Sequence, residues 1–76
     1  MVTTGQMLQA MDKAEIREIG EELFGSWGWR TRMAEFLHVN VSSVRRWVAG
    51  DVPIPGPVEV ALGYAIREHR RAQGGP

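Results

Sequence analysis

The stretch RTRMAEFLHVNVSSVRRWVAG, residues 30–50, decides the fold of this chain. Its two halves have the apolar spacing of helices, but the tripeptide HVN at 38–40 interrupts them. In each half the apolar residues recur three or four positions apart, which places them on one side of a helix. The pattern predicts a helix at about 30–37 and another at about 41–49, joined by a tight turn.

Two short helices joined by three residues must cross steeply, so their backbones come close together. The crossing needs a small residue, and Ala34 is well placed to face Val44 there. Trp47 has the spacing of a core residue. Asn40 is a good N-cap for the second helix, and we expect its side chain to accept a hydrogen bond from the backbone N–H of Ser43. The break therefore lets the second helix project from the body of the domain.

The polar face of the second helix is the candidate functional surface. Once the apolar residues face the core, Arg45 and Arg46 point outward or sideways, together with Ser42 and Val41. Such a face is narrow enough to enter a DNA major groove about 12 Å wide, where arginine can bind guanine O6 and N7. Serine can reach bases or phosphates, and Val41 is suited to a thymine methyl. We expect Arg46 to read a base and Arg45 to hold phosphate; the alternative is an ordinary solvated pair.

The charge distribution agrees with this interpretation, although the chain has a formal net charge of zero. Residues 1–29 hold two basic against five acidic residues, residues 30–50 hold four against one, and residues 51–76 hold three against three. A local basic face is sufficient to attract phosphate, whatever the total charge. The interrupted stretch is therefore the positive pole of the chain.

Several classes of protein are excluded by composition. The chain is one small domain of 76 residues without cysteine, so disulfides and cysteine-based metal sites are absent, and its two histidines are far apart. No apolar run approaches the roughly 20 residues of a membrane span, and the N-terminus is unlike a signal peptide. Ser26, Ser42 and Ser43 have no identifiable histidine and carboxylate partners. We expect a soluble cytoplasmic protein that is not an enzyme and has no cofactor, metal, membrane partner or small-molecule substrate.

A further helix precedes the interrupted stretch. Asp12 and Glu15 form a capping box, and Gly25 is a suitable stop. Gly20 lies inside this helix and weakens it by about 1 kcal/mol relative to alanine. Residues 1–11 either extend this helix, form a short one of their own, or act as an arm toward another subunit.

The last helix follows a segment that cannot be helical. Three prolines and a glycine in DVPIPGP, residues 51–57, remove donors and restrict the backbone. A helix at about 57–71 begins at Pro57, and residues 72–76 read as a flexible tail. No strand pattern is convincing anywhere, so the chain is predicted to be all-α.

Residues 30–50 resemble the helix-turn-helix of the Cro/lambda-repressor-like (XRE-type) DNA-binding family. The resemblance is carried by a small residue, apolar residues and a closing glycine: Met33, Ala34, Leu37, Val39, Val44, Trp47 and Gly50. It covers roughly residues 12–70 and implies a compact domain of four to five helices. The family often has glycine at the position of His38, where the turn is left-handed; histidine is among the residues enriched in that conformation.

The resemblance also implies which residues touch DNA. Base contacts are carried over to Val41, Ser42, Arg45 and Arg46. The predicted phosphate contacts are Arg30, Thr31, Arg32, Asn40 and Ser43. For Arg30 and Arg32 the alternative is stabilisation of their own helix or pairing with Glu35. Trp27 and Trp29 are expected to be packing or edge residues.

The expected function is sequence-specific binding of a double-stranded DNA operator with inverted repeats, by a homodimeric repressor or Cro-like switch protein. The dimer contact is left open between an N-terminal segment with Met7, Leu8 and Met11 and the last helix with Tyr64 and Ile66. The rival interpretation is a protein–protein interaction module, antitoxin-like or antiactivator-like, that uses the apolar N-terminal segment and the acidic first helix.

Overall fold

The computed structural model describes residues 11–74, and this part of the chain is all-helical. Its four helices are α2 (Lys13–Phe24), α3 (Trp29–Leu37), α4 (Val41–Ala49) and α5 (Gly56–Gly74). The prediction of an all-α domain is therefore confirmed. The expectations for Met7 and Leu8 lie outside the described residues.

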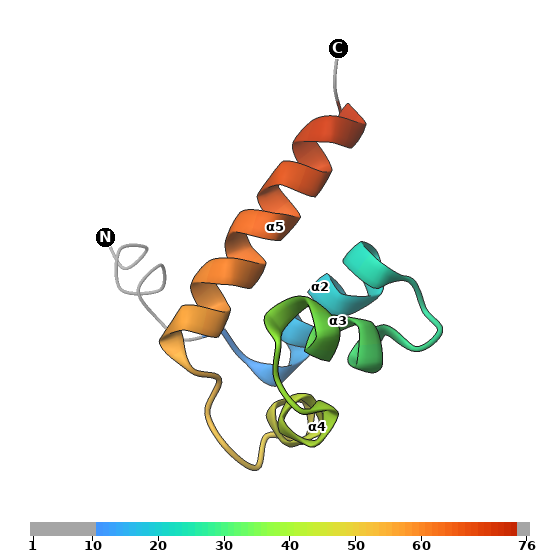
Figure 1. Ribbon diagram of the computed structural model, residues 1–76. Coiled ribbons are helices and arrows are strands. Elements are labelled where there is room, and N and C mark those ends of the chain that lie inside the picture. The colour runs from blue at the N-terminus through green and yellow to red at the C-terminus, as the bar shows by residue number, and fades with distance from the viewer. Residues whose placement is uncertain (1–10, 75–76) are drawn as a thin grey trace, which may run out of the picture.

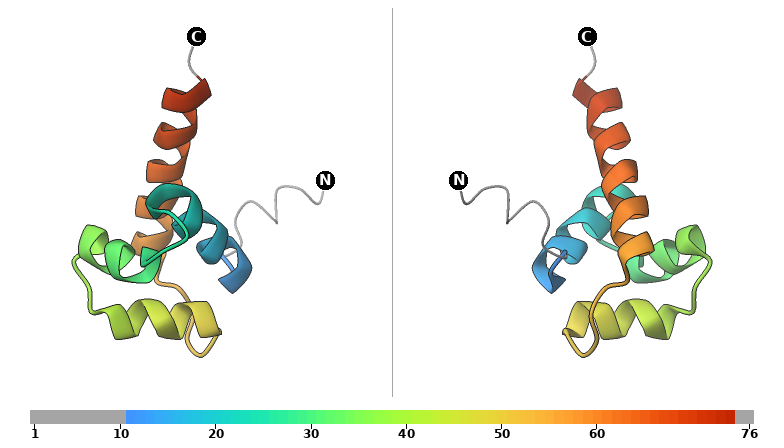
Figure 2. Two further views of the ribbon diagram at one scale, coloured as in Figure 1. Left: turned by 90° about the vertical axis from the view of Figure 1, so that its right-hand side faces the viewer. Right: turned by 90° about the vertical axis from the view of Figure 1, so that its left-hand side faces the viewer.

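The helices surround a small core, and α4 occupies one end of the molecule. In Figure 1 and in both views of Figure 2, α4 and the loop that follows it form the lower end, with no helix below them. The long helix α5 runs from this region to the opposite end, and its C-terminal half extends beyond α2 and α3. The face of α4 that points away from the core is thus open to solvent.

The helix starts follow local signals in the sequence. At the start of α2, Asp12 Oδ1 accepts from the backbone N–H of Glu15 at 2.8 Å, and Glu15 Oε1 accepts from the backbone N–H of Asp12 at 3.4 Å. This is the expected capping box. The last helix is longer than predicted, because it continues from residue 71 to Gly74. The predicted end of this helix at residue 71 is therefore wrong.

The core takes residues from all four helices and from the loop before α5. Its buried apolar members are Ile16, Ile19, Trp29, Met33, Ala34, Val44, Trp47, Ile54, Leu62 and Ile66. Trp29, one of its two tryptophans, is only 1% exposed, so it is a packing residue and not an edge residue. Trp27, two positions earlier, is 90% exposed.

Gly20 explains how such a large side chain fits. A β-carbon at Gly20 would lie 2.2 Å from Cε3 of Trp29, a distance that no packed pair of carbons adopts. The indole of Trp29 therefore lies directly against the backbone of α2. The glycine that weakens the helix locally is required by the packing of α3 on α2.

Candidate nucleic-acid interface

The turn between α3 and α4 is built around one left-handed residue. His38 has φ 60° and ψ 44°, as the resemblance predicted. Its backbone N–H donates to the carbonyl of Glu35 at 3.2 Å, and that of Val39 donates to the carbonyl of Ala34 at 2.9 Å. These two bonds are the Schellman arrangement that closes a helix. The chain can therefore leave α3 at once and begin α4 three residues later.

Asn40 caps α4, although not through the atom that the sequence analysis named. Its Oδ1 accepts from the backbone N–H of Ser42 at 3.1 Å. The prediction that it would accept from Ser43 is wrong. The backbone N–H of Ser43 donates instead to the backbone carbonyl of Asn40 at 2.9 Å, so it is already occupied.

The two faces of α4 differ sharply in burial. Val44 is 0% and Trp47 6% exposed, so both belong to the core, as predicted. Ser42, Arg45 and Arg46 are exposed, and their spacing of three and four residues places them on one face. Val41 and Ser43 are half-buried at the edges of this face.

The guanidinium groups on this face have no carboxylate partner within the described part of the chain. The ion pairs among residues 11–74 are Arg17–Glu21, Arg70–Glu22 and Arg71–Glu68. Neither Arg45 nor Arg46 takes part in any of them. Two positive charges are therefore exposed to solvent on the open side of α4, where they can bind an anionic or hydrogen-bond-accepting surface.

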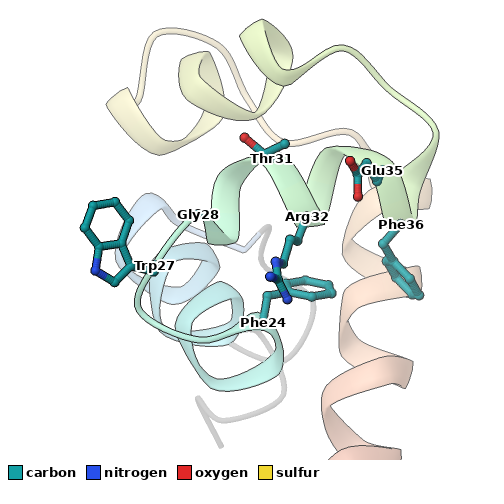
Figure 3. A pocket seen from close by; sticks show the side chains of 7 residues that line it. All are labelled: Phe24, Trp27, Gly28, Thr31, Arg32, Glu35 and Phe36. Carbon is teal, nitrogen blue, oxygen red and sulfur yellow. The ribbon is translucent and has the colours of Figure 1, made fainter.

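The predicted phosphate contacts on α3 point in different directions. Arg30 is half-buried, and its Cζ lies 4.6 Å from the ring centroid of Trp29, a cation–π contact. Gly28 precedes α3, and within residues 11–74 no side-chain cap hydrogen bond is made to the first N–H groups of this helix. In Figure 3, Thr31 lies on the side of α3 toward α4, whereas Arg32 points the other way, toward Phe24.

A hollow lined by aromatic residues opens beside α3, and the sequence alone did not predict it. Its lining is Phe24, Trp27, Gly28, Thr31, Arg32, Glu35 and Phe36, so both Thr31 and Arg32 border it (Figure 3). The rings of Phe24 and Phe36 have centroids 5.8 Å apart, and Phe36 is 47% exposed. The tryptophans of SWGW, residues 26–29, were the sequence feature that could have indicated this hollow. Only the folded chain brings Trp27 to the same surface as Phe36.

Residues 11–74 contain no group of three or more histidine, aspartate or glutamate side chains that could hold a metal ion. None of the helices in this range combines the length and apolar character required to cross a membrane.

Comparison with protein-family models, with curated proteins and with solved structures found no match for this chain. The surface of α4 therefore has to be interpreted from its own geometry and chemistry.

Proposed function

We propose that this protein is a sequence-specific double-stranded DNA-binding transcriptional regulator of the Cro/lambda-repressor-like type, with α4 as its recognition helix. The observation that carries the proposal is the open face of α4, where Ser42, Arg45 and Arg46 are exposed together. A helix of this kind fits the major groove, and arginine is the residue best suited to bind guanine there. Buried Val44 and Trp47 support the proposal, because they hold the arginines outward.

The phosphate contacts are assigned to the starts of the two helices α3 and α4. Arg30 and Thr31 flank the uncapped start of α3, where backbone N–H groups and the helix dipole favour an anion. Asn40 and Ser43 lie at the start of α4, directly after the turn. Arg32 is given a smaller part, because it points toward Phe24 and away from α4.

The regulator is proposed to act as a homodimer in the cytoplasm. One recognition helix covers only a few base pairs, whereas a symmetric pair about 34–36 Å apart would bind an inverted repeat across one turn of DNA. Repressor or Cro-like switch protein is the simplest role, since blocking a promoter needs occupancy alone. No effector or cofactor is part of this proposal.

The test compares two arginines with different proposed roles. Replacing Arg46 with alanine should cost about 1–3 kcal/mol on the preferred operator and relax the preference at one base pair. Replacing Arg30 with alanine should weaken binding to all sequences about equally and reduce the salt dependence. Both affinities are measured by titration of labelled duplexes at several salt concentrations.

Equal affinity for every duplex, unaffected by either substitution, would reject the proposal. A loss of folding is controlled by circular dichroism of each variant, and Arg46 is an exposed residue without a recorded partner in the described chain.

The alternative function, a protein–protein interaction module, is favoured by one observation. Trp27 and Phe36 expose apolar surface in the aromatic hollow beside α3. A protein of this alternative class would not bind bulk duplex DNA. A steep loss of affinity with rising salt, caused by release of counterions from DNA, distinguishes the two.

A further inference from the structure

The hydrogen bonds at the start of α4 fix the orientation of the Asn40 side chain. Its Oδ1 lies 3.1 Å from the backbone nitrogen of Ser42 and 3.0 Å from the hydroxyl oxygen of the same residue. The oxygen and nitrogen of an asparagine amide are often hard to tell apart, but a backbone N–H can only donate. The atom that faces it must therefore be the amide oxygen.

The hydroxyl of Ser42 is fixed in turn. Two oxygen atoms 3.0 Å apart require a proton between them, and the amide oxygen of Asn40 carries no proton to donate. The single hydroxyl proton of Ser42 is thus donated to Asn40. What remains on the exposed side of the hydroxyl is a pair of acceptor sites.

This restriction matters because of where Ser42 lies. It is exposed one turn before Arg45 and Arg46, on the face assigned to the major groove. A serine that rotates freely can donate to a base or accept from it, so it discriminates weakly. A serine whose proton is already committed can only accept.

We infer, on the basis of the proposed function, that the Ser42 hydroxyl acts only as an acceptor toward DNA and accepts a hydrogen bond from a base amino group. In the major groove these groups are N6 of adenine and N4 of cytosine. Guanine and thymine present the acceptors O6 and O4 at the corresponding places, and these would meet the lone pairs of the hydroxyl. The site therefore selects amino bases and rejects keto bases on the strand that Ser42 contacts.

The preference has a recognisable form in a set of bound sequences. At one position of each half-site, adenine and cytosine should both be enriched on the contacted strand, and guanine and thymine should both be depleted. Arginine contacts enrich guanine alone, so they cannot produce this column.

The first experiment selects bound duplexes from a random pool with three proteins: the wild type, Ser42→Ala, and Ser43→Ala as the matched control. The wild type should yield the amino-base column. Ser42→Ala should yield the same half-site without a preference in that column. Ser43→Ala, which removes a hydroxyl assigned to phosphate, should weaken binding to all sequences alike and keep the column.

The second experiment changes one base of the operator. An operator with adenine at this position is compared with one in which purine, which lacks the amino group, replaces it. Loss of one neutral hydrogen bond should weaken wild-type binding by roughly 2- to 12-fold. The Ser42→Ala protein should bind both operators equally.

The outcomes separate this inference from the function on which it rests. An enriched half-site with guanine or thymine in the column, or a column unchanged in Ser42→Ala, overturns the inference and leaves DNA binding in place. Equal wild-type affinity for the adenine and purine operators also overturns it. A selection that enriches no duplex overturns the proposed function and this inference with it.

Discussion

At the scale of single residues, Gly20 has the most constrained position in the core. It lies in the middle of α2, where a helix normally disfavours glycine. The Trp29 ring occupies the space that any side chain there would need, and Trp29 is 1% exposed and cannot swing into solvent without opening the core. Packing therefore outweighs helix propensity at this position.

Replacing Gly20 with alanine should lower the free energy of unfolding by about 1–3 kcal/mol, because an overpacked core must shift the ring or the backbone. Helix propensity alone would give the opposite sign, a gain of about 1 kcal/mol. Urea unfolding followed by circular dichroism measures the difference.

Gly63 in α5 supplies the matched control. A β-carbon there meets nothing within 4 Å, and Gly63 is not among the residues with positive φ. Gly63→Ala should therefore raise stability by about 0.5–1 kcal/mol. If Gly20→Ala were as stabilising as Gly63→Ala, the account of Trp29 packing would be wrong.

The sequence could predict the residues whose burial follows helical spacing. Val44 and Trp47 are buried as their spacing indicated, and Ser42 is exposed opposite them. It could not predict that Arg30 lies over Trp29 or that Arg32 turns toward Phe24. These contacts depend on where the end of α2 packs against α3, which no local pattern encodes.

At the scale of elements, the starts and turns obey local rules better than the end of α5 does. The capping box of α2 and the left-handed residue His38 follow from residue chemistry within four positions. The predicted end of α5 at residue 71 was too early because QGGP, residues 73–76, is typical of a frayed tail. Arg70 donates to both carboxylate oxygens of Glu22, at 3.1 and 2.9 Å, which holds α5 against α2 just before that point. Continuing a formed helix by one turn then costs little.

The pair between α5 and α2 predicts a pH dependence. The hydrogen bonds from Arg70 lower the pKa of Glu22 below its ordinary value of 4.5. A carboxylate with a lowered pKa in the folded state stabilises the fold above the ordinary value, and this contribution is lost as pH falls through the lowered pKa. The Arg70→Ala variant should raise the pKa of Glu22 and lose less stability across that acidic window.

The pKa is measured by NMR titration of the Glu22 carboxyl group in both proteins. Arg71→Ala is the control, because Arg71 pairs with Glu68 inside the same helix and not with α2. A Glu22 pKa that is the same in the wild type and in Arg70→Ala would contradict the prediction. Both groups are exposed, so the effect on overall stability should be small.

At the scale of the whole molecule, the charges are unevenly distributed, although the net charge of the chain is zero. Arg45 and Arg46 stand on α4 at one end, while the carboxylates of α2 lie elsewhere in the fold. The far half of α5 projects at the opposite end (Figure 1). Sequence alone predicted the charge division, but only the fold shows that the projecting helix leaves α4 uncovered.

The projecting helix also bears on the proposed dimer. Val60 and Tyr64 are 72% and 64% exposed and lie one turn apart on α5. Ile66 is 7% exposed and packs in the core, so Tyr64 is the better exposed of the two residues named for a contact through the last helix. We expect Tyr64→Glu to shift the protein toward monomer and to weaken binding to the full inverted repeat more than to one half-site.

The measurement is sedimentation equilibrium together with titration of half-site and full-site duplexes. Phe36→Glu, on the aromatic hollow, is the comparison variant, and a chain without residues 1–10 tests the other contact left open. A dimer that survives Tyr64→Glu but dissociates in either companion would move the interface away from α5.

The unequal environments of the three tryptophans give this protein built-in optical reporters. Trp27 is 90% exposed, whereas Trp29 and Trp47 are 1% and 6% exposed. Replacing Trp27 with phenylalanine would leave a tryptophan fluorescence signal that comes only from the two buried indoles, one on α3 and one on α4. The emission maximum of that variant would then report on the packing of α3 and α4 in the core, without any attached dye.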